Sequence, residues 1–290
     1  MSDLADLELA SKRDRLIELL RGMGRVVVAY SGGVDSAVVA KGAFEALGEG
    51  AVAVTAVSDS LAEGELEAAI ELAKKIGIRH QVIRTDEFAN PQYARNNPDR
   101  CYFCKSELYD RLSKLVDQHI GELIVSGANA DDAGDHRPGL RAAGERGVRH
   151  PLQECGLTKA DVRALARAWD LPAWDKPASP CLSSRVAYGE EVTPERVRMI
   201  DAAERKLRDL GLRVVRVRYH KGDLARIEVP VEELAKLASI EVREGIVSAF
   251  RSAGFQYVTL DLEGFRSGSL NAVIPIQSLE RSISVTTIKP

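Results

Sequence analysis

The sequence predicts an α/β fold, in which a parallel sheet carries helices on both faces, followed by a smaller α+β domain. Three observations predict it. Apolar strands alternate with helical patterns in the first half, the first strand ends in a glycine turn that opens a helix, and the pattern changes near Gly189. Because 290 residues suit two domains, we expect one at residues 1–188 and the other at residues 189–290.

The first half alternates strands and helices in the order typical of a parallel sheet. In chain order we expect a helix around Leu16–Leu20, a strand at Val26–Ala29, a helix from Asp35, a strand at Ala51–Val57, a helix at Leu66–Ile76, a strand at His80–Arg84, a helix at Lys105–Ile120 and a strand at Leu123–Ser126. Ligands of such sheets bind at the carboxyl ends of the strands. Val57–Ser60 and Ser126–Asp132 therefore lie on the same edge as the glycine turn.

The second half interleaves helices with three strands, which favours a small α+β domain. We expect helices at Thr193–Leu210, Val231–Leu237 and Val242–Ala253, and strands at Arg213–Tyr219, Ala225–Val229 and Gln256–Leu260. The last stretch, Ser267–Pro290, has no clear period and is interpreted as an oligomer arm or a partly disordered tail.

Composition limits the classes of partner. A net charge of −3 with both signs interspersed argues against a protein that mainly coats nucleic acid. No apolar run approaches the ~20 residues that span a bilayer, and Met1–Ala10 lacks the pattern of a signal peptide. We therefore expect a cytoplasmic protein without a membrane or nucleic-acid partner, whose four cysteines are not structural disulfides.

The segment Val26–Ser36 carries the most specific signal. A β-branched strand stops at Ser31-Gly32-Gly33, and a helix follows. Glycines let the backbone approach an anion, and the first N–H groups of a helix have no partner within it, so this turn is a phosphate cradle. It is not a Walker A loop, because the Gly-Lys-Ser/Thr ending is missing. The alternative is an ordinary turn in which Asp35 or Ser36 caps the helix.

The segment resembles the pyrophosphate loop (PP-loop) of the ATP pyrophosphatase superfamily. The resemblance implies a Rossmann-like domain that splits ATP between its α- and β-phosphates and adenylates a substrate. It also implies that Ser31, Gly32, Gly33 and Ser36 hold the leaving pyrophosphate, while Asp35 helps to place Mg²⁺ or the loop. Ser58 and Gly127 follow strands at the same edge and join the expected ATP site.

Two adjacent carboxylates, Asp131 and Asp132, follow the strand at Leu123–Ser126. Carboxylates and phosphates together suit Mg²⁺, so we expect both in the ATP site, although a plain acidic loop is the alternative. Thr158 and Asp161 read as a helix start, which leaves Lys159 to neutralise charge that develops on phosphate.

The linker Lys176–Arg185 contains prolines at 177 and 180 and a cysteine, Cys181, between them and Arg185. Its stiffness argues against a buried inert thiol, and the charges of Lys176 and Arg185 would favour a thiolate. Together with the phosphate loop, Pro-Ala-Ser-Pro-Cys-Leu-Ser-Ser-Arg resembles the LarE family of ATP-dependent sulfur transferases, which build the nickel-pincer nucleotide of lactate racemase. The resemblance covers about residues 12–270.

The LarE resemblance implies that the substrate is pyridinium-3,5-biscarboxylic acid mononucleotide. ATP adenylates a carboxylate, and a sulfur nucleophile then displaces AMP to leave a thiocarboxylate. Cys181 matches the sulfur-bearing cysteine, with Asp35 and Lys159 as the other expected catalytic residues. The expected substrate-binding residues are Arg185, Glu204, Arg216, Arg218, Glu228 and Arg266. Arginine forks suit the substrate phosphate, and a solvated charged face is the alternative.

A Cys-x-x-Cys pair, Cys101 and Cys104, precedes the helix expected from Lys105. It suits a redox pair or half a zinc site. With Cys181 it makes three thiolates, which can hold a [4Fe-4S] cluster with one open iron that carries and delivers sulfide, as in cluster-dependent family members. Other members surrender the sulfur of the cysteine itself. Cys155 is interpreted as a spare thiol.

Three rival functions share part of this pattern. A tRNA thiolase has the loop and the thiols, but no appended RNA-binding module is recognisable here. An amide-forming synthetase would need a source of ammonia, and no glutaminase domain is present. A nucleotide-binding sensor would not need Cys181. The favoured enzyme would also need sulfide or another sulfur donor, and the resemblance suggests a homo-oligomer.

Overall fold

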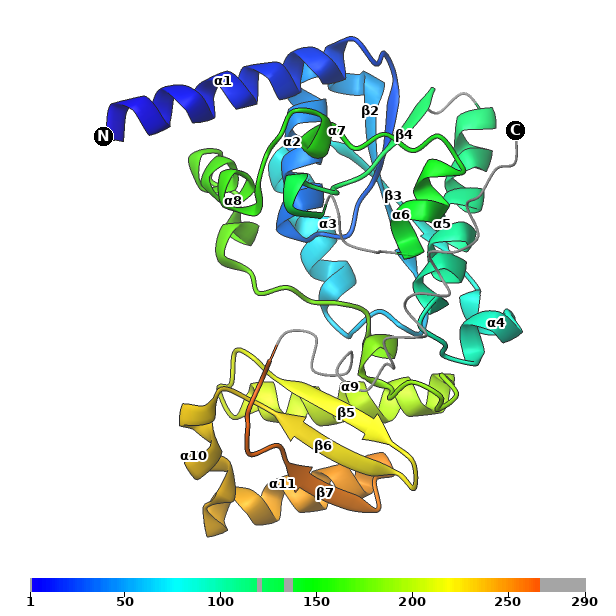
Figure 1. The fold of residues 1–290 in the computed structure, drawn as a ribbon, viewed down its shortest axis with the longest axis vertical. Helices are drawn as coiled ribbons and strands as arrows, with labels where there is room; N and C mark the ends of the chain where they lie inside the picture. Colours follow the sequence, from blue (N-terminus) through cyan, green and yellow to red (C-terminus); the bar gives the residue numbers. More distant parts are fainter. Residues whose placement is uncertain (1, 119–121, 133–137, 267–290) are drawn as a thin grey trace, which may run out of the picture. The chain divides into compact units, whose positions relative to one another are not determined.

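The computed structural model describes residues 2–118, 122–132 and 138–266, and the chain divides into two compact units (Figure 1). The first contains the chain up to Ala94 together with Asp99–Cys181. The second contains Arg95–Pro98 and the chain from Leu182 onward. This division precedes the expected boundary at 188/189. Ser267–Pro290, interpreted above as an arm or tail, lies outside the described residues.

The first unit is built on a four-stranded sheet in which every pair is parallel. Its strands are β1 (Val26–Ala29), β2 (Ala51–Val57), β3 (Arg79–Arg84) and β4 (Leu123–Val125), in the order β3-β2-β1-β4. Val26 pairs with Ala51 on one side and with Leu123 on the other, so the carboxyl ends of the central strands share one edge. The predicted parallel α/β architecture is confirmed.

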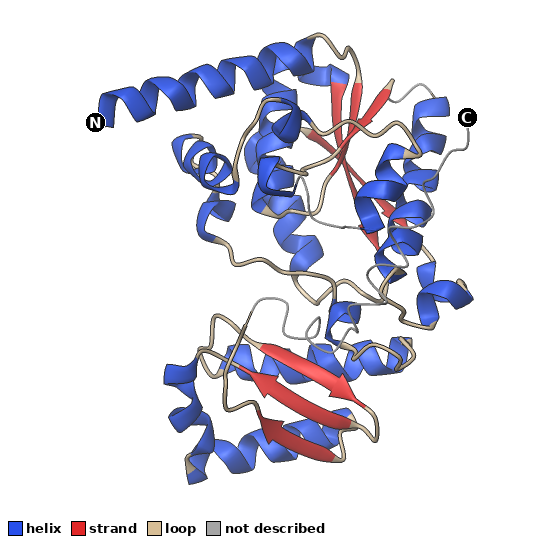
Figure 2. Ribbon diagram, in the orientation of Figure 1, coloured by secondary structure: helices blue, strands red, loops and turns tan. Residues whose placement is uncertain are grey.

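Helices cover both faces of this sheet (Figure 2). One face carries α1 (Ser2–Arg21), α2 (Val34–Leu47), α3 (Glu65–Ile76) and α8 (Lys159–Ala168), and the other carries α5 (Arg100–Asp117) and α6 (Pro138–Gly144). Each buries an apolar stripe; Leu16 and Leu20 of α1 and Leu112 of α5 are fully buried, for example. The shorter helices of this unit are η1 (Gly48–Gly50), η2 (Glu87–Ala89), α4 (Pro91–Ala94), η3 (Ala130–Asp132), α7 (Pro151–Glu154) and η4 (Pro172–Asp175).

Helix α5 begins earlier than predicted. It starts at Arg100 rather than Lys105, so Cys101 and Cys104 lie in its first turns instead of in a preceding loop. The apolar period that marks a helix in sequence comes from residues that pack on the sheet, and in α5 these are Tyr109 and Leu112. The first turns lie outside that contact and carry no such period.

The second unit has a three-stranded sheet in the order β5-β6-β7, as expected for an α+β domain. Strands β5 (Arg216–His220) and β6 (Leu224–Glu228) are antiparallel, whereas β7 (Tyr257–Leu260) runs parallel to β6. Its helices are η5 (Leu182–Arg185), α9 (Pro194–Asp209), η6 (Val231–Glu233), α10 (Leu234–Ala238) and α11 (Ile240–Ala253). Thr193 caps α9, because its hydroxyl accepts a hydrogen bond from Arg196 N at 3.3 Å.

None of the helices within the described residues is long and apolar enough to cross a membrane.

Candidate active site

The phosphate loop joins β1 to α2 and is held by its own hydroxyls. Ser31 N donates to Ser36 Oγ at 3.2 Å, Gly33 N donates to Ser31 Oγ at 3.4 Å, and Ser36 Oγ donates to Gly33 O at 3.0 Å. Gly33 is the N-cap of α2 and offers no side chain to the helix N–H groups. The loop therefore leaves the N-terminus of α2 available to an anion.

Two glycines allow the close packing around this loop. Gly32 has a φ of 71°, and a Cβ there would lie 2.9 Å from Ala69 Cβ of α3. A Cβ on Gly127, which follows β4, would lie 2.8 Å from Ser36 N. A side chain at either position would displace the loop or the start of α2. The structure thus brings Gly127, predicted from its place after a strand, to the loop itself.

Asp35 lies in the first turn of α2, between two partners from other elements. Asn129 Nδ2 donates to Asp35 Oδ1 at 3.2 Å, and Lys159 Nζ forms a salt bridge with Asp35 Oδ2. All three side chains come from the edge where β1 and β4 end. The structure therefore joins the two expected catalytic residues of the ATP site, Asp35 and Lys159, directly. Asn129 was not predicted as a site residue.

The acidic loop after β4, which contains Asp131 and Asp132, also contacts Lys159. Asn129 N donates to Asp132 Oδ2 at 3.0 Å, and Lys159 N donates to Asp131 Oδ2 at 2.8 Å. Asp131 thus lies at the N-terminus of α8, where a negative charge is favoured. Asp131 and Asp132, the two expected magnesium ligands, lie at the edge of the sheet where β1 and β4 end. Their carboxylate oxygens are of the kind that Mg²⁺ prefers.

Lys159 is positioned by the start of its own helix. Thr158 Oγ1 accepts from Asp161 N at 3.3 Å, and Thr158 N donates to Asp161 Oδ2 at 2.9 Å, which completes a capping box. Lys12 of α1 also bonds Asp161, at 2.9 Å. The first turn of α8 is therefore held from two sides, and Lys159 with it.

Ser58 lies just after β2 and its hydroxyl is engaged. It donates to Glu87 Oε1 at 2.6 Å, and Ser60 Oγ lies 2.9 Å away. Glu87 is only 3% exposed and was not identified from the sequence. No local pattern marks it, because its burial depends on how η2 packs.

The thiols Cys101, Cys104 and Cys181 all belong to the first unit, whereas Cys155 is buried in its core. The pKa of Cys104 is raised to about 12, mainly by burial and next by the charge of Cys181. Cys101 contributes in the same direction, while Lys105 opposes it. Burial lowers the pKa of Lys105, but Tyr109 and the three thiols outweigh it and raise that pKa overall. The three thiols therefore share one region around Lys105, a residue that the sequence did not single out.

No group of three His, Cys, Asp or Glu side chains in the described part of the chain is arranged to hold a metal ion. The three thiols nonetheless lie within electrostatic range of one another, and cysteine thiolates are the ligands of iron–sulfur clusters. The donor set therefore fits a cluster in its chemistry, and binding would require the thiols to converge and lose their protons.

The cations expected beside Cys181 have partners. Lys176 Nζ bonds Glu65 Oε2 of α3 at 2.7 Å. Arg185 donates two hydrogen bonds to Glu204, from Nε to Oε1 at 2.9 Å and from Nη2 to Oε2 at 3.2 Å. Both side chains are almost fully buried. Glu204 also accepts from Val217 N at 3.1 Å. These contacts favour a structural role for the pair Arg185–Glu204.

The remaining expected substrate residues lie in the second unit, and three of them, Arg216, Arg218 and Glu228, share one face of β5 and β6. Arg218 bonds Glu228 through Nε and Nη2, at 3.0 and 2.8 Å, and Arg226 bonds the other oxygen of Glu228 at 2.9 Å. Arg266 lies beyond β7, is half exposed and pairs with Glu263 at 2.6 Å. Arg226 was not predicted, although alternation along β6 places it on the same face as Glu228.

Arg216 is the most crowded cation of this face. Its pKa is lowered to about 10, mainly by burial and also by the neighbouring Arg185, Arg218 and Arg208, while Glu204 opposes the decrease. The guanidinium remains charged at neutral pH and is repelled by the neighbouring cations. A bound anion would offset that repulsion. The ring of Phe265 lies 5.3 Å below. Arg216 therefore has the surroundings of an anion-binding arginine.

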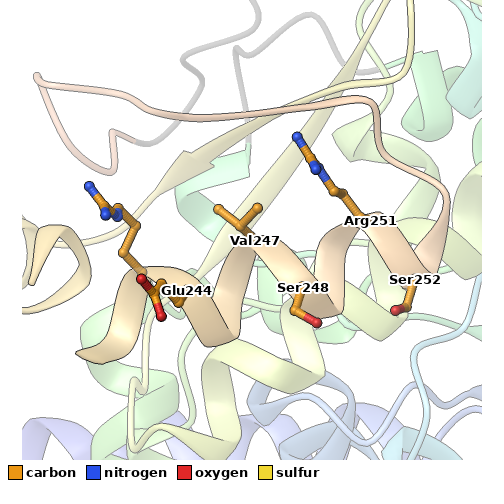
Figure 3. A pocket seen from close by; sticks show the side chains of 6 residues that line it. Glu244, Val247, Ser248, Arg251 and Ser252 are labelled. Atoms are coloured by element: carbon orange, nitrogen blue, oxygen red, sulfur yellow. The ribbon is translucent and has the colours of Figure 1, made fainter. Parts of the chain in front are cut away.

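A surface hollow also runs along α11 (Figure 3). It is lined by Arg243, Glu244, Val247, Ser248, Arg251 and Ser252. All six belong to one helix of the second unit, and none is a predicted site residue. The hollow therefore shares no residue with the candidate site described above.

Comparison with known proteins finds one family model over part of the first unit and relatives that match most of the chain. The family model for NAD synthase matches residues 16–121. An uncharacterized protein of Synechocystis sp. is 48% identical over 266 residues, 92% of this chain and 99% of its own. The pyridinium-3,5-bisthiocarboxylic acid mononucleotide synthase of Lactiplantibacillus plantarum is 39% identical over 264 residues, 91% of this chain and 95% of its own. An uncharacterized protein of Methanocaldococcus jannaschii is 30% identical over 243 residues, 84% and 91% of the two chains.

Proposed function

Because this chain belongs to the LarE family of PP-loop enzymes, we propose that it makes thiocarboxylates from pyridinium-3,5-biscarboxylic acid mononucleotide with ATP. The chain is an enzyme, a sulfurtransferase that uses ATP. The observation that carries the proposed reaction is that the phosphate loop and Cys181 belong to one compact unit. An adenylating site and a sulfur-bearing side chain are the two parts that the reaction needs.

The proposed first step is adenylation. A substrate carboxylate oxygen attacks the α-phosphorus of ATP, the bond from that phosphorus to the α,β-bridging oxygen breaks, and pyrophosphate leaves. Ser31, Gly33 and Ser36 would hold the leaving group at the N-terminus of α2. Lys159, fixed at the start of α8, would neutralise the charge that develops on phosphate.

Mg²⁺ would lie at the same edge. Asp35, Asp131 and Asp132 offer carboxylate oxygens there, and the ion usually binds through one or two carboxylates plus substrate phosphates. Bound there, the ion would supply positive charge to the phosphates. Lys159 and Asn129 would orient Asp35 for this contact.

The proposed second step is sulfur transfer. A sulfur nucleophile attacks the carbonyl carbon of the acyl adenylate, and AMP leaves with the electron pair of the broken C–O bond. Cys181, exposed at the end of the first unit, is the proposed sulfur carrier. Cys101 and Cys104 would hold a [4Fe-4S] cluster with it, and such a cluster would supply the transferable sulfur. A catalytic supply would need free sulfide or another sulfur donor.

In the second unit, we propose that Arg216 binds the phosphate of the substrate, with Arg218, Glu228 and Arg266 around it. The surroundings of Arg216 support this, because a neighbouring dianion would offset both the burial that mainly lowers its pKa and the positive charges of Arg185 and Arg218 beside it. The buried pair Arg185–Glu204 would support this face from behind its surface.

We also propose that the enzyme acts in the cytoplasm as a homo-oligomer. The four cysteines are free thiols, which suits a reducing compartment. Tyr257, Ile240 and Leu262 of the second unit are exposed apolar side chains of the kind that subunit contacts cover. Light scattering of the purified protein would measure the mass: an oligomer supports this, and a monomer at all concentrations contradicts it.

The test of the proposed activity is substrate-dependent release of pyrophosphate. With ATP and Mg²⁺, the protein should release pyrophosphate when the pyridinium nucleotide is added but not when tRNA is added. Release with tRNA alone would favour a tRNA thiolase. Nucleotide binding without any release would favour a sensor.

The cluster has its own test. Anaerobic reconstitution with iron and sulfide should give broad absorption near ~400 nm, as thiolate-held clusters do. Replacing Cys101, Cys104 or Cys181 by Ala should each weaken it, and Cys155→Ala is the matched control that should not. With excess sulfide, product should then exceed enzyme. Product that stops at one sulfur per chain, with Cys181 losing its sulfur, would instead show the sacrificial route.

A further inference from the structure

Glu87 is a buried carboxylate that the reaction described above does not use. It begins η2, is 3% exposed, and accepts hydrogen bonds from Ser58 Oγ at 2.6 Å and Ser60 Oγ at 3.1 Å. Both bonds end on the same oxygen, Oε1. The other oxygen, Oε2, makes no hydrogen bond within the described residues. One carboxylate oxygen is thus fixed by two hydroxyls, and the described residues offer no donor to the other.

Within residues 2–118, 122–132 and 138–266, no Lys, Arg or His forms an ion pair with the Glu87 carboxylate. A buried ionised carboxylate without a cation is costly, and two hydroxyl donors offset only part of its lost hydration. Proteins usually pair such a charge. A cationic group of a bound ligand would therefore stabilise this carboxylate.

Glu87 lies between the nucleotide edge and the thiols. Its hydrogen-bond donor Ser58 follows β2 on the edge of the phosphate loop, and η2 packs on α5, the helix that begins with Cys101 and Cys104. Asp86 N, next to Glu87, donates to Glu107 Oε1 of α5 at 3.4 Å. The carboxylate charge also reaches the Cys104 thiol, where it adds to the pKa increase caused mainly by burial.

We propose that Glu87 binds the cationic ring of the substrate and selects a positively charged ring over a neutral one. This inference rests on the proposed function, in which the substrate is a pyridinium nucleotide. The ring carries a permanent positive charge and must lie between the adenylating site and the sulfur carrier, which is the region that Glu87 occupies within the first unit. Ser58 and Ser60 act as positioning residues that fix Oε1 and leave Oε2 for the ring.

A structural role for Glu87 predicts a different behaviour. If the carboxylate only held the turn Ser58–Ser60, a neutral glutamine would serve equally, because its amide oxygen also accepts hydrogen bonds. Glu87→Gln removes the charge and keeps the shape. The effect of removing the charge alone therefore distinguishes binding of a cationic ring from holding the turn.

The experiment measures the dissociation constants of wild-type protein and Glu87→Gln for two ligands. One is pyridinium-3,5-biscarboxylic acid mononucleotide. The other is its carbocyclic isostere, in which a benzene ring attached through carbon replaces the pyridinium and removes the positive charge. ATP affinity, measured separately, reports the integrity of the first unit. Glu71→Gln, an exposed carboxylate of α3 with the same change in charge, is the matched control.

We expect Glu87→Gln to weaken binding of the pyridinium nucleotide at least about tenfold, while it leaves the neutral isostere, ATP and every property of Glu71→Gln unchanged. Equal effects on both ligands, or none, would overturn the proposal. If Glu87→Gln does not fold, wild-type protein that binds both ligands equally would overturn it, and a preference for the charged ring would support it. If wild-type protein binds ATP but not the pyridinium nucleotide, the proposed substrate is wrong, and this inference fails with it.

Discussion

Lys159 and Asp35 form a salt bridge at the edge of the first sheet, although 124 residues separate them in sequence. Each side chain belongs to the first turn of a helix, Asp35 in α2 and Lys159 in α8. The bridge therefore connects the helix that follows the phosphate loop with the helix whose first N–H group donates to Asp131 of the acidic loop. A nucleotide bound at this edge would meet both charges.

Removing Asp35 should stop adenylation without unfolding the protein. We expect Asp35→Ala to lower substrate-dependent pyrophosphate release by at least about 10²-fold, because preorganised charge at the reacting phosphates is lost. Lys159→Met should lower it similarly, and the double variant should lose less than the sum, since the two act as a pair. Asp14→Asn, an exposed carboxylate of α1, is the control. Normal release from a folded Asp35→Ala protein would remove the loop from ATP cleavage.

The capping box at Thr158 should affect both stability and catalysis. Thr158→Ala removes the hydroxyl that caps α8 and should lower the free energy of unfolding by about 1 kcal/mol, measured in urea. It should also slow pyrophosphate release, because Lys159 is the first residue of that helix. Thr158→Ser should retain both properties. Thr193→Ala, which removes the cap of α9, should reduce stability and leave release unchanged; slower release there would refute the local effect.

Alkylation should distinguish the two thiols of α5. The pKa of Cys104 is raised to about 12, mainly by burial, so its thiol stays protonated at neutral pH, and its thiolate fraction rises about tenfold per pH unit below that value. In cluster-free protein, iodoacetamide should therefore modify the exposed Cys101 well before Cys104 at pH 8, and Cys104 should gain on it as pH rises. Peptide mass mapping follows both sites. Equal rates in native protein, as expected after unfolding, would contradict the assigned environment.

The parallel sheet was predictable because β1, β2 and β4 are largely buried and consist mostly of apolar residues, such as Val26–Ala29. The edge strand β3 is more polar and more exposed. The phosphate loop was predictable for a related reason. Its glycines and hydroxyls follow β1 directly, so the whole motif is local in sequence. The place of Gly127 beside Ser36 followed only from the rule that parallel strands end at one edge.

Contacts that depend on tertiary packing were not predictable. The start of α5 carries Cys101 and Cys104 but none of the residues that pack in the core against the sheet, so periodicity placed the helix too late. Nothing in the sequence around Glu87 distinguishes it from an exposed polar loop residue, and its burial is seen only in the folded structure. Arg185 and Glu204 are ordinary charged residues in sequence, and only the fold makes them a buried pair.

The central claim is that one unit of this chain activates a carboxylate with ATP and transfers sulfur to it through Cys181. The most direct measurement is mass spectrometry of reactions of the wild-type and Cys181→Ala proteins with ATP, Mg²⁺, sulfide and pyridinium-3,5-biscarboxylic acid mononucleotide. Wild-type protein should give AMP, pyrophosphate and a product in which oxygen is replaced by sulfur. Cys181→Ala should give the adenylated nucleotide and pyrophosphate but no thiocarboxylate. Wild-type amounts of thiolated product from Cys181→Ala, or no substrate-dependent pyrophosphate from the wild-type protein, would contradict the claim.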